Sequence, residues 1–201
     1  MPARKGTPVK VLRAILYHIA AGLFEQPSRE QADALRALVA SLLYSTPEDA
    51  PWLPALAGIA QDLGHEESLR EEYARLFVAG VDRIPAAPYA SHWLAAGVPL
   101  SRAEVAAMMA EHGFDAGIAH GRSPDHLISE LEFAAFLAER GGAVREIQER
   151  FLRGHLYHWI PRFTGALRAA APPPRYRYAA EFLERLVAWD EAACGPPGRA
   201  H

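Results

Sequence analysis

Apolar side chains recur every three or four residues along most of this chain, which is the spacing of one helix face. Leu35, Leu38 and Leu42 illustrate it, each lying about one helical turn from the next. The chain is also rich in Ala, Leu, Glu and Arg, residues that favour helix. The helices expected on this basis span residues 9–24, 32–43, 52–63, 66–77, 101–112, 124–140, 144–158, 163–170 and 176–193.

Three of these helices have recognisable start signals. The segments 28–31 and 101–104 read as capping boxes, in which a Ser and a Gln or Glu satisfy each other's backbone N–H groups. In a third segment Ser123 is suited to the N-cap and Pro124 to the first helical position, where its missing N–H costs nothing. Leu127 and Leu131 then begin an apolar stripe, so a helix is expected to start at 124.

One long segment, residues 78–93, breaks the helical pattern. It contains Gly80, Pro85 and Pro88, and it shows no alternation typical of a strand. It also carries Tyr89 and Trp93, which makes it more aromatic than an ordinary solvated linker. Long loops without regular structure are uncommon in compact domains and are often functional. We therefore expect a Pro-rich loop that contributes to a binding site.

Length and composition indicate an all-α, single-domain bundle of roughly 8–10 helices over residues 1–194, followed by a disordered tail at 195–201. The formal net charge of −3 argues against a nucleic-acid partner. Cys194 is the single cysteine, so neither an intrachain disulfide nor a cysteine cage for a metal can form. No signal peptide or membrane-spanning run is evident, so we expect a cytoplasmic protein without stable membrane insertion.

Asp125 and His126 form the most conspicuous polar pair. They can serve simply as part of a helix start, or they can bind a ligand beside the backbone N–H groups of that start. No nucleophile elbow and no glycine-rich phosphate loop accompany them. We therefore expect no enzyme activity and no cofactor. A helical body with an apolar loop suits a module that binds peptide segments.

A metal-dependent helical enzyme is the alternative. His126 and Glu130 are four residues apart and His155 and His158 are three apart, so each pair could share a helix face. A di-iron site would also require a Glu-x-x-His pair on each of two helices, and the expected helices contain none. The sequence favours the peptide-binding interpretation, with no metal.

Three segments, in order, resemble one known family. They are Tyr73-Ala-Arg-Leu-Phe77 followed by the Pro-rich loop; Pro124-Asp-His-Leu127 followed by Glu130-Leu-Glu-Phe133; and Phe151-x-x-x-His155 followed by Trp159, Pro161 and Phe163. Together they resemble the TorD/DmsD/NarJ family of redox-enzyme maturation chaperones. The resemblance spans residues 66–163 and implies an all-helical cytoplasmic chaperone.

The resemblance also implies a partner and a site. The partner is a molybdoenzyme catalytic subunit precursor, bound in its apo form, through a twin-arginine signal peptide, or both. The chaperone assists cofactor insertion and delays export or membrane assembly until the cofactor is in place. Asp125 and His126 correspond to the polar peptide-binding pair. The residues that would shape the groove are Leu76, Phe77, Gly80, Pro88, Tyr89, Ser91 and Trp93.

The chain departs from the family at Arg122-Ser123, where relatives often carry an acidic residue and a Pro. Asp82 or Asp115 could add negative charge to Asp125 for binding a basic segment. The sequence leaves the client and the oligomeric state open, and a monomer and a dimer swapped around the Pro-rich loop are both compatible with it.

Overall fold

The computed structural model describes residues 8–46, 49–63, 66–79, 83–94, 99–115 and 121–193. In this part of the chain the secondary structure is helical, and the all-α prediction is confirmed. The elements are α1(Val9–Leu23), α2(Arg29–Ser45), α3(Leu53–Asp62), α4(Glu66–Tyr73), η1(Ala74–Val78), α5(Ala90–Trp93), α6(Arg102–Glu111), α7(Leu127–Arg140), η2(Gly141–Val144), α8(Arg145–Phe151), η3(Leu152–Leu156), α9(Tyr157–Ala169) and α10(Pro174–Ala193). The expected tail at 195–201 lies outside the described residues.

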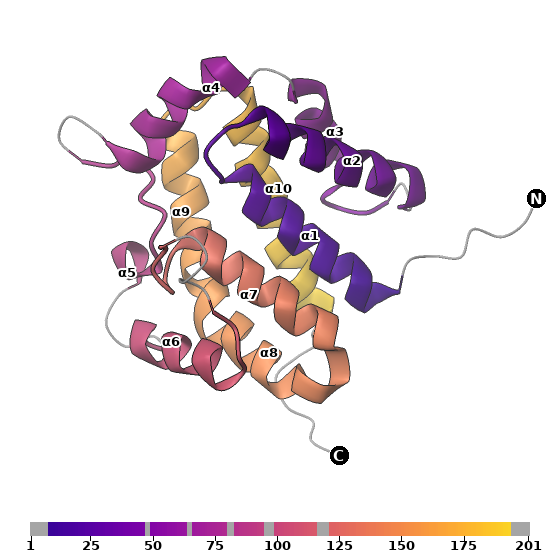
Figure 1. The fold of residues 1–201 in the computed structure, drawn as a ribbon, viewed down its shortest axis with the longest axis vertical. Helices are drawn as coiled ribbons and strands as arrows, with labels where there is room; N and C mark the ends of the chain where they lie inside the picture. Colours follow the sequence, from indigo (N-terminus) through magenta and orange to yellow (C-terminus); the bar gives the residue numbers. More distant parts are fainter. Residues whose placement is uncertain are drawn as a thin grey trace, which may run out of the picture.

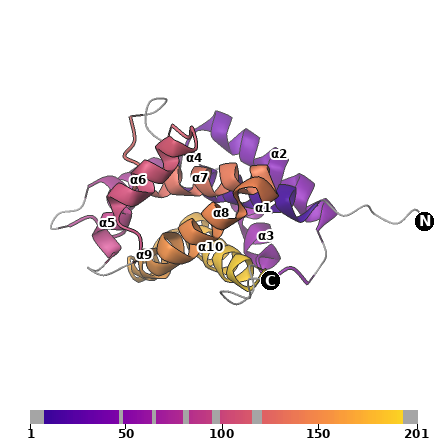
Figure 2. The same ribbon diagram turned by 90° about the horizontal axis from the view of Figure 1, so that it is seen from below.

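Helices α1 and α7 lie side by side and run in opposite directions (Figure 1). Helices α9 and α10 pack together as a second layer beneath them, as the view from below shows (Figure 2). The end of α1 therefore lies near the start of α7, and the start of α1 near the end of α7. These two ends of the α1–α7 pair carry the two candidate sites discussed below.

The core forms between these layers, and α7 is its most completely buried helix. The apolar positions predicted for its inner face, including Leu127, Leu131 and Leu137, are fully buried. Removing side chains of this size from water contributes about 1.5–3 kcal/mol each. No helix among the described residues is both long and apolar enough to cross a membrane.

Two of the three predicted helix starts are confirmed. The Ser101 hydroxyl accepts from the Glu104 amide, and the Glu104 carboxylate accepts from the Ser101 amide, completing a capping box. Ser28 caps α2 by accepting from the Gln31 amide at 3.2 Å. The Gln31 side chain, however, donates to the carbonyl of Gly22 on α1, so it joins two helices and leaves the box incomplete.

The predicted start of α7 was wrong by three residues. The helix begins at Leu127, and its N-cap is His126, whose Nδ1 accepts a 3.2 Å hydrogen bond from the Ile128 amide. Ser123 instead opens a turn in which its carbonyl accepts from the His126 amide at 3.0 Å. The Ser123 hydroxyl donates to the Asp125 carboxylate and accepts from Arg102 at 3.0 Å, so its oxygen is engaged away from the first amides of α7.

The break expected between helices 144–158 and 163–170 is absent, and Pro161 lies within a continuous helix. It lies inside α9, which follows directly from the π-helical segment η3 and continues to Ala169. A proline here removes one backbone hydrogen bond. The buried side chains of Trp159 and Phe163 on either side of it keep the helix packed against the core.

The Pro-rich loop contains a short helix that the sequence analysis did not predict. Residues 83–89 are irregular, but α5 adds one helical turn before the described part of the loop ends at Leu94. Gly80 and Asp82 lie outside the described residues.

Candidate functional site

The Pro-rich loop is joined to the start of α7 by backbone hydrogen bonds. The Leu127 amide donates to the Pro88 carbonyl at 2.8 Å, and the Ala90 amide donates to the Asp125 carbonyl at 2.9 Å. Together they form an isolated antiparallel bridge between Tyr89 and His126. Three predicted site residues, Tyr89, Asp125 and His126, thus come together although they belong to separate segments.

The Asp125 side chain is almost completely buried, with 2% of its surface exposed. The Ser123 hydroxyl donates to it, and Arg102 approaches its Oδ1 to 3.3 Å through Nε. Burial alone would raise the pKa of this carboxyl, but hydrogen bonds from Ser123 and Ser91 and the Arg102 charge outweigh it and lower the pKa. Asp125 is therefore a carboxylate that holds the loop, the turn and α6 together.

His126 combines two roles. Its Nδ1 caps α7, and its ring packs edge-on against Tyr89, with the ring centroids 5.1 Å apart. Burial, reinforced by the nearby Arg122 charge, lowers the pKa of His126 to about 4. The ring is consequently neutral at pH 7, as its acceptor role at Nδ1 requires.

Trp93 anchors the other end of the described loop. Its Nε1 donates to the Ala87 carbonyl at 2.7 Å, and its ring contacts Phe163 on α9 at a centroid distance of 6.4 Å. Arg162 on the same helix donates to the Trp93 carbonyl at 2.6 Å. The loop is therefore fixed at Pro88 and Ala90 by the start of α7 and at Trp93 by α9.

Leu76 and Phe77 lie beneath the loop rather than on its surface. Both are buried, and the Phe77 ring packs against Tyr73, with Phe24 and Phe163 close by. The Ala86 amide donates to the Leu76 carbonyl at 3.0 Å, which ties the loop to this aromatic layer. Pro88 is also buried. These predicted residues support the site from below.

The exposed residues of the candidate site are Tyr89, Ser91 and Arg102. Together with the nearly buried His126, whose ring packs against Tyr89, they form what we call the junction surface. Tyr89 is 39% exposed although its ring is held by His126. Ser91 is exposed, Arg102 is 59% exposed, and the His126 side chain is nearly covered. A fixed, half-exposed aromatic ring next to hydrogen-bonding groups suits contact with a peptide.

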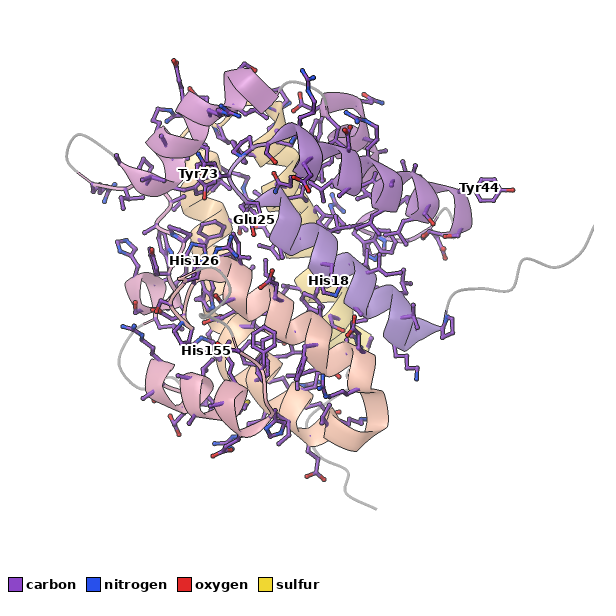
Figure 3. All side chains as sticks on the ribbon, viewed as in Figure 1. His18, Glu25, Tyr44, Tyr73, His126 and His155 are labelled. Atoms are coloured by element: carbon purple, nitrogen blue, oxygen red, sulfur yellow. The ribbon has the colours of Figure 1, made fainter. Side chains whose placement is uncertain are left out.

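A second ion pair that the sequence analysis missed borders this surface. Arg122 contacts both carboxylate oxygens of Glu25 through Nη2, at 2.6 and 2.7 Å. Tyr73, Glu25 and His126 lie close to one another in Figure 3, and burial together with the Glu25 charge raises the pKa of Tyr73. Glu25 follows α1 and belongs to no motif, so no sequence signal pointed to it.

Asp115, which the sequence offered as a further negative charge for the site, is exposed beyond the end of α6.

The four residues of the alternative metal site do not gather. Glu130 and His155 are fully buried and paired, with Oε1 and Nε2 2.7 Å apart, whereas His158 is exposed. Trp159 donates to the other Glu130 oxygen at 2.9 Å. No group of three or more His, Cys, Asp or Glu residues able to hold a metal is found among the described residues.

The buried pair is structural in character. His155 Nδ1 lies 3.1 Å from the Leu100 carbonyl, so both ring nitrogens face an acceptor. Burial alone would lower the pKa of His155, but the Glu130 carboxylate and this carbonyl raise it. His155 lies in η3, between α8 and α9, and its ring joins α7 to the segment before α6.

Comparison with known proteins decides the family. The family model described as nitrate reductase delta subunit matches residues 24–165. The proteins named Tat proofreading chaperone DmsD from Salmonella typhi and Salmonella paratyphi A are each 30% identical over 182 residues, covering 89% of this chain and 84% of theirs. The chain belongs to the TorD/DmsD/NarJ family of redox-enzyme maturation chaperones.

A solved structure shares the fold of this maturation chaperone. It is a redox enzyme maturation protein from Archaeoglobus fulgidus, 19% identical, with a TM-score of 0.58 over 87% of this chain and 93% of that one. The range matched by the family model contains the Pro-rich loop, the turn before α7 and the Glu130–His155 pair. The resemblance read from the three sequence segments is thereby confirmed.

Proposed function

We propose that this maturation chaperone binds the apo form of a molybdenum-cofactor oxidoreductase, including its twin-arginine signal peptide, and releases it once the cofactor is inserted. It would act in the cytoplasm, without catalysing a reaction of its own. The observation that carries the proposal is the junction surface, where Tyr89 stays 39% exposed while the Tyr89–His126 bridge fixes its backbone. Family membership supports the same function.

The chemistry of a signal peptide fits this surface. Such a peptide has a basic first part and an apolar second part. The ring of Tyr89 offers an aromatic face to the apolar part of the peptide. The carboxylates of Asp125 and Glu25 lie close by and carry the negative charge that attracts the basic part. In this structure Asp125 is paired with Arg102, and Glu25 is paired with Arg122. The Glu25 carboxylate is 28% exposed, so a client's arginine would compete with Arg122 for its oxygens, whereas the buried Asp125 carboxylate would be reached only after Arg102 moves aside.

A pull-down from the native host tests the proposal. The full chain carrying a small affinity tag should recover the precursor of a molybdopterin-dependent oxidoreductase, and the variant Tyr89→Ala should recover less of it. The control is Tyr44→Ala, which removes a 74% exposed tyrosine on α2, well away from His126 (Figure 3). Recovery of unrelated proteins alone, or no binding to any twin-arginine peptide, would contradict the proposal.

A further inference from the structure

A cleft of about 310 Å³ lies at the opposite end of the α1–α7 pair from the junction surface. The start of α1, the end of α7, the first turns of α8 and the end of α10 enclose it. The volume is that of a small-molecule site. Of the predicted peptide-binding residues that the structure describes, none lines it.

The cleft is cationic although the whole chain carries a net charge of −3. Among the described residues that line it, Lys10, Arg13 and Arg145 are positive, and Glu149 alone is negative. Glu149 pairs with Arg145 at 2.9 Å. Lys10 and Arg13 are three residues apart on α1 and so share a face of that helix.

An ion pair with a buried carboxylate positions the Arg13 side chain. Its Nε contacts the Asp190 carboxylate, which is fully buried beneath the cleft wall. Tyr17 and Tyr157 donate to the other oxygen of that carboxylate, at 2.6 and 3.3 Å. One edge of the guanidinium is thus fixed. With Lys10, Arg13 and Arg145 set against Glu149 and Asp190, the cleft as a whole keeps a net positive charge. A fixed guanidinium is well suited to bind an oxyanion.

A second observation points to a ligand independently of the charges. The Gln148 side chain lines the cleft and is 4% exposed, and its Nε2 has no hydrogen-bond partner in the described structure. A buried amide donor without an acceptor is costly, so an acceptor that enters the cleft gains affinity from it. The 15-residue helix α1 also begins here without a side-chain cap or an acidic residue in its first turn.

We propose that this cleft binds a small phosphate-type oxyanion, either free or as the phosphate group of a small molecule. Donors reach it from two helices, Lys10 and Arg13 from α1 and Arg145 and Gln148 from α8. A tetrahedral anion presents oxygens in several directions and can accept from both helices, whereas a planar carboxylate is matched by a single guanidinium. A Cβ at Gly142 would meet open space, so the backbone at this rim leaves room for the ligand.

The test is the thermal unfolding midpoint of the full chain during titration with inorganic phosphate or with glycerol 3-phosphate, at ionic strength held constant with potassium chloride. Binding to the folded state raises the midpoint, and above the dissociation constant the rise grows with the logarithm of the ligand concentration. Equal effects of the two ligands identify the phosphate group alone as the ligand. A stronger effect of glycerol 3-phosphate identifies a phosphorylated small molecule. Acetate should have little effect.

Two variants localise the binding. Lys10→Gln removes an exposed cation, and Gln148→Leu removes the unpaired donor while keeping an apolar side chain of similar size in its place. Each should weaken the apparent affinity about fivefold. Arg36→Gln, which removes an exposed cation on α2, is the charge-matched control and should bind as the unmodified chain does. No rise in the midpoint, a rise that is merely linear in phosphate concentration as for a non-specific salt effect, or equal weakening in Arg36→Gln would overturn the proposal.

Discussion

The Leu127 amide donates a 2.8 Å hydrogen bond to the carbonyl oxygen of Pro88, and this bond attaches the Pro-rich loop to the first residue of α7. The paired bond from the Ala90 amide to the Asp125 carbonyl lies on the other side of Tyr89. Tyr89 is therefore held from both sides by the backbone of the α7 start. Changes in the turn before α7 are expected to act on the loop, and through it on client binding.

Replacing His126 separates its role as a cap from its role as a ring beside Tyr89. His126→Ala removes the acceptor for the Ile128 amide and should lower the free energy of unfolding by about 1 kcal/mol. His126→Asn supplies another good cap and should cost less stability, yet it also removes the ring that packs on Tyr89. Urea unfolding measures the first effect and peptide titration the second. Equal stability losses in the two variants would contradict the capping role.

The stability of the chain should depend on pH through His126. Its pKa is about 4 in the folded state and near the ordinary value of 6.5 when unfolded. Between pH 6.5 and pH 4 His126 is therefore protonated in the unfolded state and neutral in the folded state. The contribution of the neutral ring to the free energy of unfolding is fully present above pH 6.5 and is lost as the pH falls toward 4. Urea unfolding at pH 7.5 and pH 5 should show a larger loss for the unmodified chain than for His126→Asn. Parallel losses would contradict the assignment.

Breaking the Glu130–His155 pair should lower the free energy of unfolding strongly and should leave the metal content of the protein unchanged. Glu130→Ala leaves His155 Nε2 and Trp159 Nε1 without their acceptor in a buried site, and should cost about 3–5 kcal/mol. Glu130→Gln keeps one acceptor oxygen and should cost less. The control is Glu139→Gln, an exposed carboxylate on the same helix, which should be nearly neutral. Similar small effects in all three would show that the pair is dispensable.

Leu131→Ala tests the packing of α7 against the core. The side chain is fully buried, so its truncation should destabilise the chain by about 2–5 kcal/mol. Because Leu131 does not belong to the junction surface, peptide affinity measured well below the unfolding midpoint should stay close to that of the unmodified chain. Thermal unfolding and peptide titration on the same preparation distinguish the two outcomes.

Much of the helical architecture could be predicted from sequence because it depends on local periodicity. The inner face of α7 and the Ser101 cap are examples in which a residue and its partner lie within about one turn of each other. The start of α7 was misplaced for a physical reason. Ser123 opens a turn that ends at His126, and the side chain of this histidine provides the cap instead.

The candidate site was only partly predictable. Asp125, His126 and Tyr89 were identified and do meet. Glu25 was not, because its pairing with Arg122 joins residues far apart in the chain. The pairing of Glu130 with His155 and Trp159 was missed for the same reason, since helical spacing says which face a residue occupies but not which distant helix packs there.

The most direct test of the central claim is the affinity of the chain for a twin-arginine signal peptide from the molybdoenzyme encoded nearest to it. Fluorescence anisotropy of the labelled peptide would be measured with the unmodified chain, Tyr89→Ala and Tyr44→Ala. We expect Tyr89→Ala to bind at least about tenfold more weakly, as for an aromatic contact at the centre of an interface, and Tyr44→Ala to bind normally. Unchanged affinity in Tyr89→Ala would contradict the junction surface as the peptide site.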